Sequence, residues 1–340
     1  MSVADELREV VRRSLAGAAD RRRFLADEDR PAQIDADLWQ LLSGDIGVAG
    51  LLIPEELGGG GGTFGELAVV LAEAGAVLAP VPVLSTAGFA VPLLRSAGTP
   101  AADAILRRIA AGGVTAAVAW CDDRQPESAS FVLDGAAPGV MLAVAGDELW
   151  AVEATRIEPM RTLDLTRGMA EVDFVRTEAL GRPNTDLTLV SLAAEQVGLA
   201  GRILDDAVAY AKVRQQFGRP IGSFQAVKHK LADLLLEVEI GRAALDLAVE
   251  AADAYLDTGD ADGLRTAAPM VAGHCGEMAT LVARESLHVF GGIGFTWEHD
   301  AHLYYRRAKA DEVLLGHPAG HRRRLAVERG LFGAQRSPSS

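Results

Sequence analysis

The chain has 340 residues and a formal net charge of −14 at pH 7, so it is long enough for two or three packed units. Hydrophobic residues make up 49% of it, which allows a large core and argues against general disorder. The acidic balance argues against nucleic acid as a partner, because phosphate binding needs clustered Lys and Arg. No run of about 20 uninterrupted apolar residues predicts a membrane span. The charged, amphipathic start predicts a cytoplasmic protein rather than a secretory signal.

Residues 1–113 are predicted to form a helical domain. Apolar residues recur at helical spacing in several segments, at 7–15, 38–42, 64–75 and 101–111. Thr63 precedes the segment at 64–75 and Glu66 follows three residues later, which predicts a capping box. Pro54 and the glycines at 58–62 predict the loop before this helix, because a glycine run does not hold regular structure.

Residues 114–185 are predicted to form a small β domain. Short runs rich in Val, Leu, Trp and Phe follow one another, as VTAAVAW, SASFVLDG, GVMLAVAG and ELWAVEA. The turn pairs DG, PG and GD separate these runs. We therefore expect short strands joined by tight turns.

Residues 186–332 are predicted to form an antiparallel helical bundle. Long amphipathic helices are expected at 188–213, 225–256 and 264–290, and shorter ones at 301–314 and 319–329. The Ser-rich end, residues 333–340, is predicted to be a flexible tail. The predicted fold class is therefore α+β and mainly α, with an N-terminal helical domain, a small central β domain and a C-terminal helical bundle.

The cysteines and histidines do not predict a disulfide or a metal site. Cys121 and Cys275 lie far apart in sequence and outside any metal-ligand spacing, so both are expected to be small buried apolar residues. His317 and His321 are four residues apart, which is compatible with zinc. Because no third ligand motif accompanies them, a solvated pair at a helix start is the preferred interpretation.

Two segments of the last region are unusual for plain bundle helices. The first reads RQQFGRPIGSFQ, from Arg214 to Gln225, and predicts a helix end, a Gly/Pro turn and a new helix near Ser223. Arg214 supplies a forked cation suited to phosphate, and the next helix adds free N–H groups. The second reads HVFGGIGF, from His288 to Phe295, and its glycines would let the backbone approach a flat or anionic ligand. Each segment alone also suits a structural turn between helices.

Together and in this order, the two segments resemble the C-terminal domain of the acyl-CoA dehydrogenases. The resemblance extends over residues 193–324. AAEQVGLAGRILDDAVAYAKVRQQFGRPIGSFQAVKHKLAD is similar to the helix–loop–helix of that family, and FGGIGF followed by YYRRAK is similar to its flavin loop and next helix. GVAGLLIPEELGGGG and GELAVVLAEAG also resemble the opening helical domain of the family.

The resemblance implies that FAD is the cofactor and that it is held at a dimer interface. The Arg and Phe of the R-x-x-F-G motif contact the FAD of the neighbouring subunit, as does a following Gln, and the G-G-x-G loop lies against the adenosine diphosphate part. His288 stands where many members have Gln, and imidazole can still donate a hydrogen bond. The residues assigned to cofactor binding on this basis are Arg214, Gln216, Phe217, Gln225, His288, Gly291, Gly292 and Gly294.

Two departures from the family decide the functional interpretation, and the first concerns the catalytic base. The family base is a Glu that abstracts the α-proton of the acyl thioester. Counted forward from the R-D-A-K-like motif, that position falls on Leu315. The alternative base position, at the start of the first C-terminal helix, falls on Thr188. Neither side chain is a credible base at neutral pH, so no catalytic residue is assigned in this chain.

Carboxylates near the base position leave one alternative open. Glu312 and Asp311 lie about one helical turn before Leu315, and Glu195 is a further nearby carboxylate. Glu312 or Asp311 could substitute as the base. A solvated or ion-paired helix face beside Arg306 and Arg307 is the commoner role for such residues and is the preferred interpretation.

The second departure concerns the flavin cradle. The family carries a T-E-P-x-A-G-S-D-like strand and loop that bind the flavin ring and pyrophosphate, whereas the matching region here reads AVAWCDDRQPESASF. The β region is also shorter than usual. The chain thus keeps the contacts to a neighbour's FAD and lacks the cradle for its own. Some bacterial members, notably in actinobacterial steroid breakdown, are α2β2 assemblies in which one chain supplies base and cradle, and this chain resembles the other.

The leading hypothesis is therefore a flavin-dependent acyl-CoA dehydrogenase subunit that desaturates an acyl-CoA thioester together with a homologous partner chain. A self-sufficient homo-oligomer, a non-catalytic scaffold subunit and a flavin oxidase or monooxygenase remain alternatives. An electron-transfer flavoprotein is a candidate electron acceptor. The sequence does not identify the acyl group, which could be fatty, branched or steroid.

Overall fold

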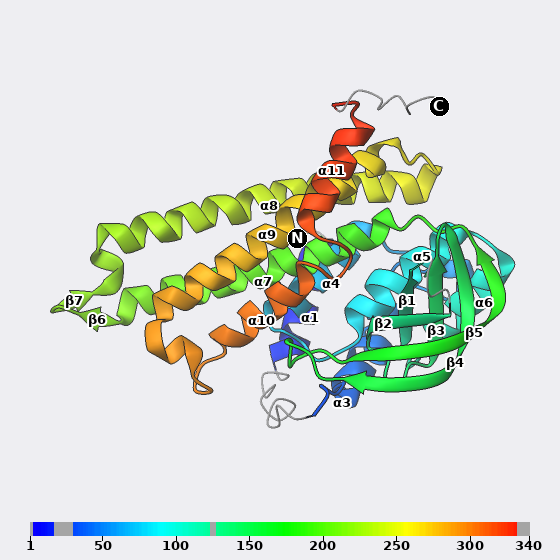
Figure 1. Ribbon diagram of the computed structural model, residues 1–340, viewed down its shortest axis with the longest axis horizontal. Coiled ribbons are helices and arrows are strands. Elements are labelled where there is room, and N and C mark those ends of the chain that lie inside the picture. The colour runs from blue at the N-terminus through cyan, green and yellow to red at the C-terminus, as the bar shows by residue number, and fades with distance from the viewer. Residues whose placement is uncertain (1–2, 17–29, 123–126, 332–340) are drawn as a thin grey trace, which may run out of the picture.

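The computed structural model describes residues 3–16, 30–122 and 127–331. Helices come first, a small sheet follows, and a long helical bundle completes the chain (Figure 1). This mainly helical α+β architecture confirms the predicted fold class. The tail predicted at 333–340 lies outside the described residues.

The N-terminal part is built from short helices and turns. Its α-helices are α1 (Val3–Ala16), α3 (Ala36–Gln40), α4 (Phe64–Ala76), α5 (Val91–Ala97) and α6 (Pro100–Ala110). Short 3-10 or π-helical segments lie between them, at Leu41–Asp45, Val48–Gly50, Glu55–Leu57 and Leu84–Ala90. The predicted capping box is confirmed at α4, because the Glu66 N–H donates to Thr63 Oγ1 at 3.1 Å and the Thr63 N–H donates to Glu66 Oε2 at 2.8 Å.

The central part is a five-stranded sheet in the order β1-β3-β4-β5-β2. Its strands are β1 (Ala116–Cys121), β2 (Ser128–Leu133), β3 (Val140–Ala145), β4 (Glu148–Met160) and β5 (Met169–Gly181). Strands β1 and β3 are parallel and the other pairs are antiparallel. The expectation of short strands alone was wrong. β4 and β5 are 13 residues long, and β5 was not among the predicted runs because its polar and apolar residues do not form one hydrophobic stretch.

The C-terminal part is a bundle of three long helices with two shorter ones packed on it. These are α7 (Asp186–Val213), α8 (Gln225–Thr258), α9 (Asp262–Phe290), α10 (Ala301–Asp311) and α11 (Pro318–Glu328). Helices α7, α8 and α9 lie side by side along the length of the molecule (Figure 1). Each predicted helix of this region is therefore confirmed, with ends that differ by a few residues.

Helix α7 is the central element of the molecule. It packs on α9, on α8 and on α4 of the N-terminal part. The contact with α4 is close, because a β-carbon on Gly198 would lie 1.9 Å from the Ala72 carbonyl oxygen and one on Gly75 would lie 2.4 Å from the Glu195 carbonyl oxygen. Among the described residues, α7 is also the one helix long and apolar enough to cross a membrane by length and composition. Its apolar window is 89% buried inside the fold, which is equally the property of a core helix.

The cysteines differ in their burial. Cys275 is fully buried in α9, as expected. The expectation was wrong for Cys121, which is only partly buried, because it ends strand β1 beside an open hollow.

Candidate functional site

The first motif forms a projecting turn at one end of the bundle. Helix α7 ends at Val213, the strands β6 (Gln215–Gln216) and β7 (Arg219–Pro220) make a small hairpin, and a 3-10 turn (Ile221–Ser223) leads into α8. Figure 1 places this hairpin at the left-hand tip of the molecule. The predicted helix–turn–helix is therefore confirmed, with the new helix beginning at Gln225.

Phe217 is the most exposed residue of this turn. Its side chain is 92% exposed and its φ angle is +53°, a backbone region that side-chain-bearing residues rarely adopt. The ring meets Phe224 edge to face at 6.2 Å, and the Arg219 guanidinium lies 4.0 Å from the Phe224 ring centre. A large aromatic ring held outward in this way costs hydration free energy unless another surface covers it.

Arg214 and its neighbours add polar groups to the same turn. Arg214 caps the end of α7, and its guanidinium is exposed, with no carboxylate partner among the described residues. Gln216 is exposed in β6, and Gln225 is exposed at the first turn of α8. An unpaired guanidinium at a helix junction can make charge-assisted hydrogen bonds with an anion.

The second motif follows α9 as a glycine-rich 3-10 turn (Gly291–Phe295). Gly291 has φ +65° and ψ −144°, a conformation that needs glycine, and nothing lies within 4 Å of a β-carbon placed on Gly291 or Gly292. Gly294 is buried instead, with Leu287 and Phe290 atoms 3.0 Å from its β-carbon position. Exposed glycine backbone gives a ligand close access, whereas Gly294 serves packing.

The fold brings the two motifs to the same end of the bundle. The Tyr210 ring of α7 packs on the Phe290 ring of α9, with centroids 5.1 Å apart. Lys230 of α8 forms an ion pair with Glu285 of α9, and His288 Nδ1 lies 3.6 Å from the same carboxylate. The hairpin and the glycine turn therefore flank one exposed surface.

A separate hollow lies at the opposite end of α7. It measures about 460 Å³ and is lined by Trp120 and Cys121 at the end of β1, by Val144 in β3 and Gly146 just after it, and by Thr185 just before α7. The lining includes part of the segment that replaces the family cradle. Helix α7 has 28 residues and spans about 42 Å between Thr185 and Arg214. The hollow thus lies at the end of α7 next to the sheet and the two motifs at the end next to β6 and β7. Figure 1 shows the sheet and the β6–β7 hairpin on opposite sides of the molecule.

The base positions hold no carboxylate. Thr188 is 1% exposed and its hydroxyl donates to the Thr185 carbonyl oxygen at 2.7 Å. Leu315 is partly buried against the core. Glu312 is 7% exposed, and its Oε2 accepts hydrogen bonds from Thr280 and from Lys309, each at 2.8 Å.

Asp311 belongs to a buried cluster of charged side chains. Arg167, in the loop between β4 and β5, donates to Asp311 Oδ1 at 2.7 Å and to Glu195 of α7. Arg307 of α10 donates to Glu195 at 2.8 Å and to Asp164. The cluster ties together the sheet, α7 and α10.

Asp311 and Glu312 are ion-paired, with Arg167 and Lys309, which was one branch of the preferred interpretation. The solvated branch was wrong, because both side chains are buried. Sequence reasoning named Glu195 and missed Asp164 and Arg167, because charged residues in a connection between strands give no local signal of burial.

The cluster shifts the pKa values of its members in different directions. Burial raises the pKa of Asp311 to about 7, with Arg167 opposing that rise, and its Oδ2 has no hydrogen-bond partner among the described residues. Burial would also raise the pKa of Asp164, but the guanidiniums of Arg307 and Arg167 outweigh it and hold that pKa below its usual value. Burial thus favours the protonated form of Asp311 but not that of Asp164.

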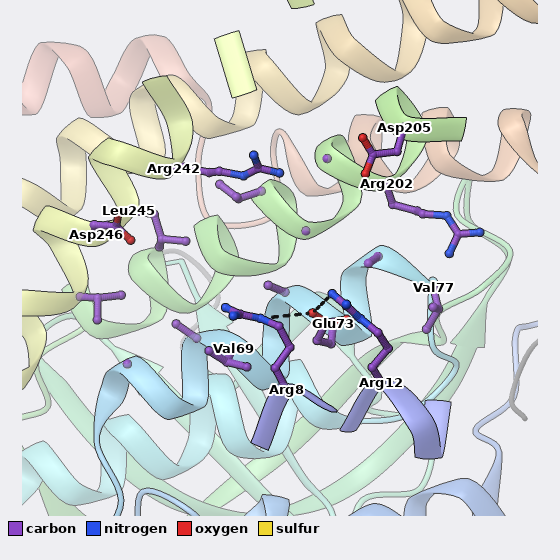
Figure 2. A pocket seen from close by; sticks show the side chains of 18 residues that line it. Arg8, Arg12, Val69, Glu73, Val77, Arg202, Asp205, Arg242, Leu245 and Asp246 are labelled. Atoms are coloured by element: carbon purple, nitrogen blue, oxygen red, sulfur yellow. Dashed lines mark hydrogen bonds and ion pairs between the residues drawn. The ribbon is translucent and has the colours of Figure 1, made fainter. Parts of the chain in front are cut away.

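A second groove is unrelated to the predicted site residues. It measures about 760 Å³ and lies between α1, α4, α7 and α8 (Figure 2). Arg12 holds Glu73 through two hydrogen bonds of 2.7 and 2.9 Å, and Arg8 lies 3.5 Å from the same carboxylate. Arg202 and Arg242 likewise pair with carboxylates of their own helices. Since each of its arginines has an acidic partner, this groove has little free positive charge.

The histidine pair lies at the start of α11. His317 is the N-cap and its Nδ1 accepts from the Ala319 N–H at 3.2 Å, whereas His321 is partly buried. Over the described ranges, no group of three or more His, Cys, Asp or Glu residues is placed to hold a metal ion.

Comparisons with known proteins agree with this architecture. The family model "Acyl-CoA dehydrogenase, N-terminal domain" matches residues 2–113, and "Acyl-CoA dehydrogenase, C-terminal domain" matches residues 186–329. Acyl-CoA dehydrogenase IpdE2 of Mycolicibacterium smegmatis is 36% identical over 329 residues, covering 95% of this chain and 99% of that protein. IpdE2 of Mycobacterium tuberculosis is 38% identical over 296 residues, covering 86% and 87%.

A solved structure gives the same result. The ChsE4-ChsE5 complex from Mycobacterium tuberculosis aligns with a TM-score of 0.81 and 26% identity, covering 100% of this chain and 99% of that one. The chain therefore belongs to the acyl-CoA dehydrogenase family, and the resemblance noted in its sequence is confirmed. This membership supports an oxidoreductase that acts on acyl-CoA.

Proposed function

We propose that this chain is a flavin-dependent acyl-CoA dehydrogenase subunit that completes the FAD site of a homologous partner chain. The observation that carries the proposal is the distance between the two exposed motifs and the hollow beside the sheet. The exposed motifs around Arg214 and Gly291 lie at one end of α7, and the hollow at the end of β1 lies about 42 Å away. One cofactor does not fill both, so the motifs serve a flavin held by another chain.

The residues at the exposed end suit that role. Arg214 offers an unpaired guanidinium for a pyrophosphate oxygen, and Phe217 offers an uncovered ring for an apolar or flat partner. The open backbone at Gly291 and Gly292 admits close approach of an adenosine diphosphate moiety. Gln216, Gln225 and His288 are exposed nearby and can donate hydrogen bonds. Bound FAD would supply the hydride acceptor for α,β-desaturation of an acyl-CoA thioester.

The base is proposed to come from the partner chain. Leu315 and Thr188 cannot accept the α-proton, and Glu312 and Asp311 are both buried in ion pairs of this chain. These contacts disfavour the homomeric alternative, which needs one of these two carboxylates to be free. The relatives in heteromeric assemblies, such as the ChsE4-ChsE5 complex, support a partner chain.

The proposed substrate is an acyl-CoA thioester. A steroid-linked acyl group is favoured by the likeness to a second solved structure, a variant of the Tcur3481-Tcur3483 steroid ACAD, at 26% identity and a TM-score of 0.81. We retain the domain division at 1–113, 114–185 and 186–332, a cytoplasmic location and an electron-transfer flavoprotein as candidate acceptor.

The test uses the chain alone and in complex with a homologous chain that carries the family Glu. Alone, the chain should bind well under one FAD per subunit, and the complex should bind FAD and desaturate acyl-CoA. In the complex, Glu312→Gln should leave turnover nearly unchanged, whereas Glu→Gln at the partner's base should lower it ~10²–10⁴-fold. Stoichiometric FAD on the lone chain, or a collapse of turnover from Glu312→Gln with intact FAD content, would refute the proposal.

The scaffold alternative gives a different result in the same complex. If the chain only stabilises its partner, Arg214→Ala should leave both FAD retention and turnover unchanged. Loss of FAD with an intact complex instead assigns this chain a direct part in the cofactor site.

A further inference from the structure

One carboxylate connects the segments that follow the two exposed motifs and precede them. Glu285 lies in α9, six residues before Gly291, and its side chain is 18% exposed. Its Oε2 forms an ion pair with the Nζ of Lys230, which lies in α8 five residues after Gln225. Its Oε1 accepts a hydrogen bond from Arg284 Nε at 3.1 Å. The carboxylate therefore ties the end of α9 to the start of α8.

His288 is a further basic partner of this carboxylate. Its Nδ1 lies 3.6 Å from Glu285 Oε2, and its side chain is 56% exposed. Among the described residues, this is the one ion pair or hydrogen bond of His288. Lys230, more than Arg284 or His288, holds the pKa of Glu285 below its usual value, against the effect of burial. Glu285 is therefore ionised at neutral pH.

An ionised carboxylate determines which nitrogen of a neighbouring imidazole carries a proton. The ring nitrogen that faces the carboxylate is stabilised as an N–H group, and in His288 that nitrogen is Nδ1. The ring then presents Nε2 to a ligand, as an acceptor when the imidazole is neutral and as a donor when it is protonated. Without the carboxylate, an exposed ring samples several rotamers and both N–H forms. Glu285 thus determines which atom of His288 a ligand meets.

The carboxylate is itself held in place. Lys230 approaches it from α8, and Arg284 approaches its other oxygen from α9. A group that is held by several contacts orients a neighbouring binding residue more precisely than an exposed side chain is oriented alone. Glu285 therefore has the surroundings of a residue that supports a binding site from behind.

We propose that Glu285 is a positioning residue of the cofactor site, which holds the His288 ring so that its Nε2 is presented to the FAD of the partner chain. The inference rests on the proposed function, because it requires the surface between the two motifs to meet that FAD. Glu285 acts through His288 and does not itself contact the cofactor. The residue lies outside both motifs, so neither of them includes this role.

The first test is a double-mutant cycle in the flavin-loaded complex with a homologous chain, with FAD affinity measured by fluorescence titration. His288→Ala and Glu285→Ala should each weaken FAD binding about 3–10-fold. In the His288→Ala background, Glu285→Ala should add less than about 2-fold, because no ring is left to orient. The same loss from Glu285→Ala with and without His288 would overturn the proposal, because Glu285 would then act only by holding α8 to α9.

Two more variants complete this test. Glu277→Gln is the matched control, because Glu277 lies eight residues earlier in α9 and forms a comparable ion pair with Arg322 at 2.5 Å. It should leave FAD binding unchanged. Arg214→Ala separates this inference from the proposed function. If Arg214→Ala weakens FAD binding and Glu285→Ala does not, the positioning role alone is refuted, and if neither weakens it, the proposed function is refuted as well.

The second test needs no cofactor. In the full chain labelled with 15N-histidine, the NMR signals of the His288 ring at pH 8, where an imidazole is neutral, should show the proton on Nδ1. Glu285→Ala should move this proton to Nε2, the form that a free histidine side chain prefers, whereas Glu277→Gln should leave it on Nδ1. A His288 ring with the same proton position in the wild-type and Glu285→Ala chains would overturn the proposal.

Discussion

Replacing Asp311 by Asn should change how the stability of the protein depends on pH. Asp311 is 1% exposed, and its Oδ1 accepts from Arg167 while its Oδ2 has no partner among the described residues. The cluster around it contains the guanidiniums of Arg167 and Arg307 and the carboxylates of Asp164 and Glu195. These four charges balance, so an ionised Asp311 adds an uncompensated buried negative charge. Because its pKa is about 7, Asp311 is expected to keep its proton on Oδ2 below neutral pH and to ionise above it.

The magnitude follows from the pKa. Burial raises the pKa of Asp311 from 3.8 to about 7. Between these values the folded chain holds a proton that the unfolded chain releases, so the free energy of unfolding falls as the pH rises through this window and levels off above it. At 1.36 kcal/mol per pKa unit, the shift corresponds to about 4 kcal/mol of stability lost between pH 4 and pH 8.

Asp311→Asn removes this dependence because an amide does not titrate. The free energy of unfolding of the variant should be lower by a constant of about 1–3 kcal/mol, because the amide matches its partners poorly. The difference from wild type should become smaller as the pH rises, because only the wild-type protein loses stability. Denaturant-induced unfolding at pH 5, 6, 7 and 8 gives the difference between the two proteins. Gln196→Met is the control, because it removes a hydrogen bond to the Asp311 main-chain carbonyl oxygen at the same helix end without removing a titratable group. Curves for Asp311→Asn and wild type that stay parallel from pH 5 to pH 8 would refute the assignment of the proton.

Three further predictions concern the cofactor motif, the helix packing and a helix cap. In a flavin-loaded complex, Arg214→Ala should weaken FAD retention by roughly 1.5–3 kcal/mol, and unchanged FAD affinity by fluorescence titration would leave this motif as a structural turn. Gly198→Ala should lower the free energy of unfolding by about 1–3 kcal/mol or prevent folding, because the new methyl group would meet the Ala72 carbonyl oxygen. A melting temperature equal to that of wild type would contradict the close contact of α4 with α7. Thr63→Ala should cost about 1 kcal/mol in chemical denaturation, and Thr63→Ser much less, since Ser preserves the cap.

The two motifs around Arg214 and Gly291 illustrate what sequence reasoning can and cannot place. The run from Arg214 to Gln225 predicted a helix end, a turn and a new helix, because Gly and Pro act on the backbone locally. The outward position of Phe217 was not predictable from those letters, since its positive φ angle depends on how the hairpin closes between α7 and α8. Their assignment to FAD stays a prediction that the proposed mutants test.

By itself, the sequence determined the order of helices, strands and helices, the capping box at Thr63, the long helices of the bundle and the two turns that follow α7 and α9. These features depend on periodicity, caps and turn residues, which act over a few residues at a time. Only the tertiary structure decided that Arg167 and Asp311, 144 positions apart, share a buried hydrogen bond, and that a single helix separates the motifs around Arg214 and Gly291 from the hollow. The same applies to the burial of α8, where Leu236 is 60% exposed and Leu234 is 3% exposed, because burial depends on the elements packed around a helix and not on the sequence of that helix alone.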